Sequence, residues 1–312
     1  MLKASFIIPF YNDGESAIIT AKLAKANTSL ALEFIFIDDG STETYNEEEI
    51  RGLGILIKNT RNSGVGFSFD RGVEKASHEL LFLSGADIRF KAGEDFGMGL
   101  VDYLDDKSII ASSCVSLTPD MQDPRLGGTV RSGADLKFFI DNKDVPNKPE
   151  NYRDIISAKW FGIKELTRTK KNIHEVPCIL GAFYLTTKSW YNHIRGFEGH
   201  QMWGCLEPYI SIKTWLSGGT CKVATNIKTG HIFARNPHRN TAIHYPLYNK
   251  LLTALTCLPT NIARRLIEHL GDNPILEEAK SLIYYNQDQI IELYKYYQEE
   301  IFNQPFEKVF RY

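Results

Sequence analysis

The sequence predicts an α/β protein with a mostly parallel central sheet and a helical C-terminal extension. Two observations lead to this fold class. Over residues 1–90, apolar runs typical of buried strands alternate with helix-like stretches, an order typical of a parallel sheet covered by helices on both faces. From about residue 246 onward, apolar residues recur at three- and four-residue spacing, which indicates amphipathic helices.

The elements follow in chain order. The expected strands of the first part are residues 5–10, 33–38, 54–59 and 79–84. The expected helices of this part are residues 14–26, a short glutamate-rich stretch after residue 41, and residues 65–76. Turn signals containing Asn, Asp, Gly or Ser separate strands from helices.

The second part is more varied. Residues 119–175 contain several prolines and many charges without a clear period, which predicts an irregular insertion that shapes a substrate site. Residues 177–187 look strand-like and residues 206–219 look helical. In the tail, Pro246, Pro259 and Pro274 lie where helices are expected to begin.

Composition narrows the class of protein. The chain has 312 residues, 43% of them hydrophobic, and a net charge of −2. These values allow a large core and give no overall bias towards nucleic acid or membrane surfaces. The five cysteines form no CxxC pair, so zinc and redox motifs are not indicated. Without a signal-like N-terminus or an apolar run long enough for a membrane span, the chain is expected to be cytoplasmic.

One section is strongly basic. Between Glu207 and Glu268 there is no acidic residue, whereas eight lysines and arginines fall there. This section is suited to neutralising a diphosphate or an anionic acceptor, DNA included. The alternative is that acidic residues from elsewhere in the chain lie beside it in space.

Acidic residues follow two of the expected strands. Asp38 and Asp39 close the second strand, and Asp87 comes shortly after the apolar run LLFLS at residues 80–84. Ligands of open α/β sheets bind at the carboxyl ends of strands. The sequence therefore predicts a functional site at this edge.

Several blocks resemble a known family. SFIIPFYNDGESA, FIFIDDGSTE and NSGVGFSFDRGVEKASHELLFLSGAD resemble the opening of family 2 glycosyltransferases with the GT-A fold. The block from ILGAFYLTTKSW through GF, WG and GG to GHIFARN is similar to the C-terminal catalytic half of polypeptide N-acetylgalactosaminyltransferases and their bacterial relatives. The resemblance covers roughly residues 4–90 and 177–236.

This resemblance implies a Rossmann-like GT-A domain over residues 1–240 and a helical extension over residues 241–312. Within the domain we expect a nucleotide-binding half, a variable acceptor-side insertion and a metal and acceptor half, at residues 1–90, 91–176 and 177–240. It also implies a metal-dependent hexosyl- or pentosyltransferase that uses a UDP-sugar and Mn²⁺ or Mg²⁺. A cation of this kind stabilises the charge of a departing diphosphate.

The resemblance assigns residues to the donor site. Four residues after the first strand are expected to lie against the nucleotide base: Pro9, Phe10, Tyr11 and Asn12. Asp39 matches the acid that bonds uracil, although an Asp-Gly-Ser turn also begins helices well. Asn62 and Gly64 are expected beside base and ribose, and Arg71 to reach the site. Arg235 and Arg239 are expected on a loop that closes over the diphosphate.

The metal assignment rests on two residues. Relatives carry Asp-x-Asp, Asp-x-Asp-Asp or Asp-Ser-His after this strand, whereas Ser84 and Ala86 replace the first and third positions here. Asp87 then matches the last acid of the longer form, and His231 of GHIF matches the family's metal-binding histidine. Diphosphate oxygens and waters would complete the shell.

The reacting end of the site is assigned in the same way. Glu207, after Trp-Gly, is the candidate general base if transfer inverts the anomeric centre, and otherwise a sugar or acceptor contact. An acid favoured by a helix N-terminus is the structural alternative. Trp203 is expected to wall the sugar pocket, and Gly181 to let the sugar approach the backbone.

Two other functions stay open. A nucleotidyltransferase uses a similar sheet, but the sequence lacks its early Gly-rich loop. A degenerate nucleotide-sugar-binding protein without transfer activity would explain Ser84, Ala86 and Leu206. The acceptor hydroxyl is not readable from the sequence: a glycan, a lipid-linked sugar, a protein and a nucleic acid all fit.

Overall fold

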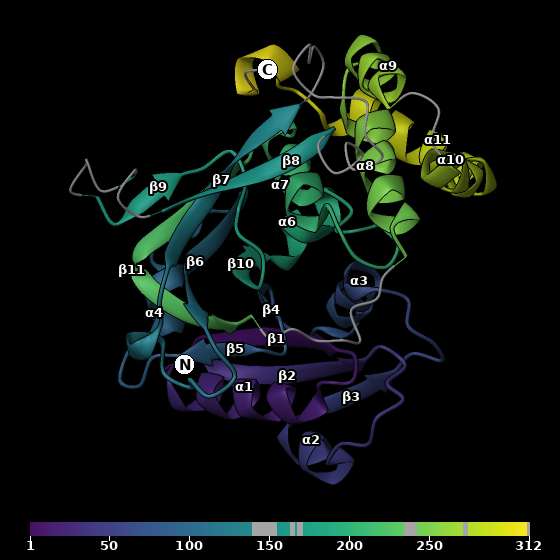
Figure 1. The fold of residues 1–312 in the computed structure, drawn as a ribbon. Coiled ribbons are helices and arrows are strands. Elements are labelled where there is room, and N and C mark those ends of the chain that lie inside the picture. Colours follow the sequence, from purple (N-terminus) through teal and green to yellow (C-terminus); the bar gives the residue numbers. More distant parts are fainter. Residues whose placement is uncertain (139–154, 163–165, 167–170, 234–241, 271–273, 311–312) are drawn as a thin grey trace.

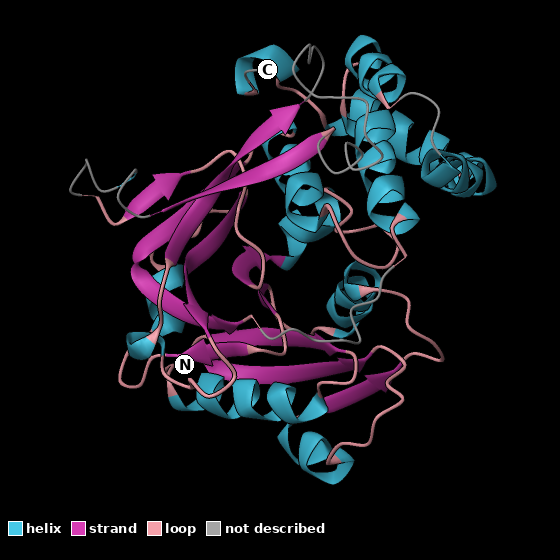
Figure 2. Ribbon diagram, viewed as in Figure 1, coloured by secondary structure: helices cyan, strands magenta, loops and turns pink. Residues whose placement is uncertain are grey.

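The computed structural model describes residues 1–138, 155–162, 166, 171–233, 242–270 and 274–310. They form a mixed eleven-stranded sheet with helices on both faces (Figure 1, Figure 2). The strands are β1 (Lys3–Phe10), β2 (Ala31–Asp38), β3 (Ile55–Lys58), β4 (Leu80–Ser84), β5 (Ile88–Phe90), β6 (Ser108–Leu117), β7 (Val130–Phe138), β8 (Ile156–Gly162), β9 (Ile173–Glu175), β10 (Phe183–Thr187) and β11 (Thr220–Ile232).

Helices fill most of the connections and the C-terminal part. They are α1 (Gly14–Ala26), α2 (Glu47–Leu53), α3 (Val65–Lys75), α4 (Phe96–Val101), α6 (Lys188–His193), α7 (Leu206–Leu216), α8 (His244–Cys257), α9 (Thr260–His269), α10 (Pro274–Tyr285), α11 (Gln287–Lys295) and α12 (Phe306–Val309). A 3₁₀ turn lies at Pro124–Leu126 and a π-helical turn at Tyr296–Ile301.

The first four strands form the parallel half of the sheet, in the order β3-β2-β1-β4. Their side chains alternate between two cores: Phe6 and Ile8 pack with α1, whereas Ile7 packs with α3 on the other face. The register pairs Phe10 with Asp38 and Asp38 with Lys58. Three strands therefore end at one edge, which confirms the expected parallel sheet covered on both faces.

The second half of the sheet is mixed. β10 lies antiparallel between β4 and β6, and β11 runs parallel to β6 but antiparallel to β5 and β9. The β11 register shifts between Ala224 and Lys228, so its first part pairs with β9 and its last part with β5. This shift delivers the end of β11 to the loop after β4.

The prediction of an irregular insertion at residues 119–175 is wrong for the residues that form β7, β8 and β9. β7 and β8 form an antiparallel hairpin, and β9 joins β11. Ala134, Leu136 and Phe138 face the core while Asp135 and Lys137 face outward. The charges thus decorate the solvent side of a half-buried hairpin. Residues 139–154 lie outside the described part of the chain.

Another expected strand is shorter than predicted. Only Phe183–Thr187 of residues 177–187 forms β10. Gly181 and Ala182 precede it, and Ala182 has a left-handed φ of 87°. These two residues form a bend immediately before β10.

The helical tail is confirmed. α8 lies against α7, α10 and α11, and its apolar side chains join the same core as α7. Pro246 falls in the first turn of α8, Pro259 precedes α9 and Pro274 opens α10. Within the described ranges, no helix combines the length and apolar character that crossing a bilayer requires.

Candidate active site

Asp39 lies in the loop that follows β2 and is only 4% exposed. Its Oδ1 accepts hydrogen bonds from Asn59 Nδ2 (2.6 Å) and the Ser63 backbone N–H (2.9 Å). Its Oδ2 accepts one from the Gly64 N–H at 2.8 Å. Burial raises the pKa of Asp39, and these hydrogen bonds oppose that shift. In the structure, then, Asp39 orders the loop from Asn59 to Gly64. Its contact with a base stays a prediction.

Replacing Asp39 with alanine is expected to destabilise the protein by about 2–4 kcal/mol, because several buried donors lose their acceptor. Urea unfolding measures the change. Glu48→Ala, at an exposed position in α2, is the matched control and should change stability by less than about 0.5 kcal/mol. Equal effects of the two substitutions would contradict the anchoring role.

The loop after β1 is held in the same way. Asn12 adopts a left-handed φ of 53°, and its Oδ1 accepts hydrogen bonds from the N–H groups of Thr42 (2.8 Å) and Glu43 (3.0 Å). Phe10 is buried edge-on against Tyr45, with ring centroids 5.0 Å apart. Pro9 is buried and Tyr11 is half-buried. The predicted base-binding loop is therefore held by hydrogen bonds and packing, and it lies beside the Asp39 loop.

Gly64 connects the loop after β3 to the loop before α7. It forms an isolated parallel bridge with Met202, and its φ of 99° suits glycine. A Cβ at this position would lie 2.3 Å from the Met202 carbonyl oxygen. Asn62, also predicted for the donor site, is half-buried two residues earlier. This contact places the predicted ribose loop next to Trp203.

Arg71 reaches the site indirectly. Its guanidinium donates to Asn59 Oδ1 and, at 3.4 Å, to the Lys58 carbonyl oxygen. Asn59 in turn donates to Asp39. Arg71 therefore supports the Asp39 loop through Asn59. Its direct contact with a nucleotide-sugar donor stays a prediction.

Asp87 and His231 come together although they are far apart in the sequence. β5 pairs with β11, His231 opposite Ile88, and the Ile232 N–H donates to the Asp87 carbonyl oxygen at 3.1 Å. His231 Nε2 lies 3.3 Å from Asp87 Oδ1. The two side chains are nearly buried, with residue exposures of 8% for Asp87 and 9% for His231.

This pair has the chemistry of an open metal site. Two ligands about 2.1 Å from one cation and at right angles to it would lie about 3.0 Å apart, close to the observed separation. A carboxylate oxygen with an imidazole nitrogen suits Mn²⁺ and related cations. His231 Nδ1 is buried without a hydrogen-bond partner among the described residues. No group of three or more His, Cys, Asp or Glu that could hold a metal occurs in that part of the chain. Asp87 and His231 therefore fit a cation that takes its other ligands from substrate and water.

Arg89 lies next to this pair and was not foreseen. It is 2% exposed and donates to Thr20 Oγ1 (3.0 Å), Ser16 Oγ (3.1 Å), Gln122 Oε1 (2.5 Å) and the Ile88 carbonyl. Burial lowers its pKa, and the nearby Asp87 and Asp13 carboxylates raise it in opposition. It places a fixed positive charge behind Asp87. An Arg inside a short apolar strand, IRF, was the available sequence signal.

Glu207 lies in the first turn of α7 and faces Gly181. A Cβ on Gly181 would lie 1.8 Å from Glu207 Oε1. Gly181 thus makes room for the carboxylate, a different use from the predicted close approach of a sugar, which stays a prediction. Burial raises the pKa of Glu207, and the charge of His231 opposes this shift. Glu207 therefore lies within electrostatic reach of the Asp87–His231 pair.

Substituting Gly181 with alanine should displace Glu207 and lower the turnover number by about tenfold to 100-fold, because small misplacement of a reacting group is costly. Steady-state rates of UDP release from the predicted UDP-sugar donor measure this effect. Gly52→Ala is the matched control, since a Cβ there meets nothing within 4 Å. Unchanged turnover in Gly181→Ala would show that Glu207 needs no such space.

The loop carrying Trp203 is fastened to the tail. Asn249 of α8 accepts from the Gln201 N–H (2.9 Å) and donates to the carbonyls of Gln201 (2.7 Å) and Gly204 (3.1 Å). Trp203 itself is 56% exposed beside this anchor. Asn249 was missed, although a lone Asn among apolar helical residues signals a buried polar contact. Arg235 and Arg239 lie outside the described residues.

The fold is similar to that of a solved glycosyltransferase structure. The structure of GalNAc-T7 with UDP, GalNAc and Mn²⁺ is similar with a TM-score of 0.65 and 18% identity, and the match covers 96% of this chain and 57% of that chain. The fold is therefore that of GT-A glycosyltransferases. Residues 5–120 match the family model described as glycosyl transferase family 2. This match covers the N-terminal part of the chain, from β1 to just beyond β6.

Polypeptide N-acetylgalactosaminyltransferases are among the proteins with similar sequences. Polypeptide N-acetylgalactosaminyltransferase 16 of Mus musculus is 23% identical over 245 residues, 75% of this chain and 41% of that protein. Polypeptide N-acetylgalactosaminyltransferase 10 of Rattus norvegicus is 22% identical over 246 residues, 74% of this chain and 38% of that protein. This chain therefore spans about two fifths of the length of the relatives that it matches.

Proposed function

We propose that the chain transfers a sugar from a UDP-sugar to an acceptor hydroxyl, with a divalent cation, Mn²⁺ or Mg²⁺, held by Asp87 and His231. One observation carries the proposal: His231 Nε2 lies 3.3 Å from Asp87 Oδ1 at the carboxyl edge of a GT-A sheet. The relative GalNAc-T7 binds UDP, GalNAc and Mn²⁺, which supports the choice of donor and cation.

The residues divide the work between donor and acceptor. The loop at residues 9–12 and the loop ordered by Asp39 bind the base and ribose. A bound cation neutralises charge on the departing diphosphate. Arg235 and Arg239 neutralise part of the same charge. Trp203 walls the sugar pocket. Glu207 accepts the proton of the acceptor hydroxyl if the anomeric centre inverts, and otherwise holds the sugar or acceptor.

The test is release of UDP from a panel of common UDP-sugars, with Mn²⁺, with Mg²⁺ and with a chelator. We expect release with at least one donor and its loss on chelation. Nucleotide binding without release would favour the degenerate binding protein. Pyrophosphate release from a nucleoside triphosphate and a sugar phosphate would favour a nucleotidyltransferase.

The compartment and the domain division are parts of the same proposal. All five cysteines are free, and four of them are buried, an arrangement suited to the reducing cytoplasm. Residues 1–240 are proposed as the catalytic domain, with residues 1–90, 91–176 and 177–240 as its parts and residues 241–312 as the extension.

A further inference from the structure

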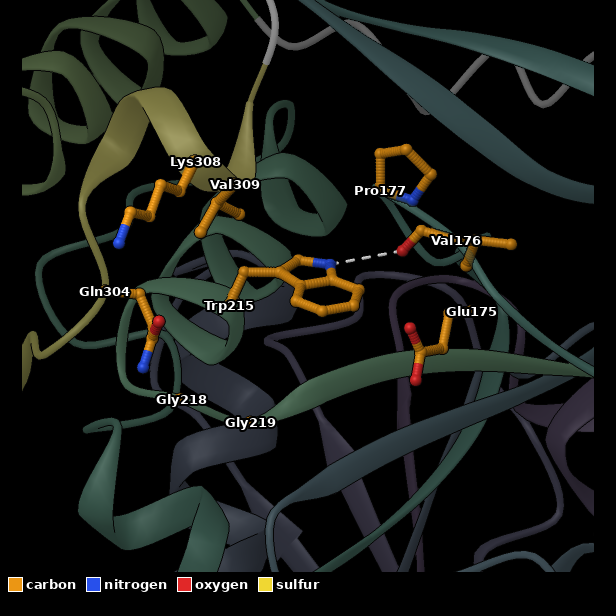
Figure 3. A pocket seen from close by; sticks show the side chains of 9 residues that line it. All are labelled: Glu175, Val176, Pro177, Trp215, Gly218, Gly219, Gln304, Lys308 and Val309. Atoms are coloured by element: carbon orange, nitrogen blue, oxygen red, sulfur yellow. Dashed lines mark hydrogen bonds between the residues drawn. The ribbon is translucent and has the colours of Figure 1, made fainter.

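A hollow of about 450 Å³ opens at the C-terminal end of α7. Glu207 lies in the first turn of this eleven-residue helix and Trp215 near its end, so the hollow and the catalytic carboxylate lie at opposite ends of a helix about 16 Å long. The hollow is lined by Glu175, Val176, Pro177, Trp215, Gly218, Gly219, Gln304, Lys308 and Val309 (Figure 3).

Trp215 is the centre of this hollow (Figure 3). Its indole Nε1 donates to the Val176 carbonyl oxygen at 3.2 Å, which fixes the ring and uses its only polar atom. The ring therefore offers an apolar face. Glu175 lies to one side of the ring, and Gln304 and Lys308 lie to the other (Figure 3). A flat apolar face between hydrogen-bonding groups matches a pyranose, which has C–H faces and hydroxyl edges.

A second hollow of about 400 Å³ adjoins the first, because Glu175 and Pro177 line both. Its other lining residues include Asp135, Lys159, Trp160 and Phe161. Each hollow falls in the range of about 300–1,000 Å³ typical of ligand pockets. Two joined hollows suit a chain of rings better than one ring.

The second hollow also approaches the catalytic site. Trp160 is 45% exposed, and its ring centroid lies 6.1 Å from that of Phe233. Phe233 in turn lies edge-on to His231, with ring centroids 4.0 Å apart. The rings of Trp160 and Phe233 thus connect this hollow to the Asp87–His231 pair.

We propose that the two hollows form one groove that binds an oligosaccharide, with Trp215 and Trp160 as stacking platforms, and that this oligosaccharide is the acceptor. The acceptor role rests on the proposed transferase function. Saccharide binding does not rest on it. The polar groups at the rim, Glu175, Lys159, Gln304 and Lys308, bind hydroxyls along the chain.

The test measures binding without any donor. Cello-, malto- and chito-oligosaccharides, together with a Ser/Thr-rich peptide of similar length, are titrated by calorimetry and by ligand-observed NMR. We expect at least one oligosaccharide to bind, and Trp215→Ala and Trp160→Ala each to weaken it about tenfold or more. Trp215→Phe, which keeps a ring, should weaken it less, and Tyr285→Ala removes an exposed aromatic side chain of α10 as the matched control.

Donor hydrolysis separates this inference from the proposed function. UDP release in the absence of an acceptor should be unchanged in Trp215→Ala, while transfer to the bound oligosaccharide should fall. Glu175→Gln and Lys308→Ala, on the rim, give the same comparison should Trp215→Ala fail to fold. Binding without donor turnover in the wild type supports the groove and contradicts the transferase. Peptide binding alone, or saccharide binding insensitive to both tryptophans, overturns the groove.

Discussion

His231→Ala and Asp87→Ala are each expected to lower Mn²⁺-dependent UDP release by about 100-fold or more. Even changes outside the ligand shell of a metal cost about tenfold to 100-fold, and these two side chains are the proposed ligands themselves. They lie 3.3 Å apart, and no third such ligand joins them in the described ranges. Initial rates of UDP release at several Mn²⁺ concentrations measure the effect.

Direct Mn²⁺ binding, followed by electron paramagnetic resonance, gives a readout that does not depend on turnover. Binding should weaken in both alanine variants and in Asp87→Asn, which keeps the shape of the side chain. His193→Ala, an exposed histidine of α6, is the control and should bind Mn²⁺ like the wild type. Wild-type rates and wild-type Mn²⁺ affinity in folded His231→Ala protein would refute the metal assignment.

Glu207→Gln is expected to reduce sugar transfer by about 10²–10⁴-fold, the range that a general base contributes. Glutamine keeps the volume that fits against Gly181 but cannot accept the proton. A buried base must be ionised to work, and burial raises the pKa of Glu207. The transfer rate should therefore fall as pH decreases through that raised pKa, at higher pH than for an exposed glutamate. A pH–rate profile of the wild type measures this fall of the transfer rate at low pH.

The same substitution should affect stability and activity in opposite directions. A carboxyl whose pKa is raised in the folded state contributes stability when protonated and loses that contribution as pH rises through the folded pKa. At neutral pH its removal should leave the free energy of unfolding equal or higher. If Glu207→Gln transfers sugar at the wild-type maximal rate but with a higher acceptor KM, Glu207 binds the acceptor and is not the base.

Local sequence patterns were enough to predict much of the fold, and motif resemblance was enough to predict one long-range contact. The apolar runs gave the parallel strands, because strands buried on both faces carry an unbroken signal. The Asp87–His231 pair followed from motif resemblance, and strand pairing between β5 and β11 supplies its physical cause. The helices of the tail were visible from their period.

What could not be predicted depends on contacts between distant segments. The alternation in β7 was hidden by a bulge near Gly133 and by charges on its solvent face. The space that Gly181 leaves for Glu207 exists only because α7 packs against the turn before β10. The oxygens of Asp39, a predicted base contact, accept hydrogen bonds from donors of the next loop, and no periodicity in the sequence indicates such a partner.

The hydrogen bonds between Asn249 and residues 201–204 tie α8 to the loop that carries Trp203. Because a single amide side chain bonds both ends of that turn, any change that loosens α8 also frees Trp203 and the start of α7. Trimming this protein to a minimal catalytic core by cutting before residue 244 would expose the apolar side of α7 and blunt activity at the same time. We therefore expect α8 to be needed for the placement of Trp203 and of the start of α7.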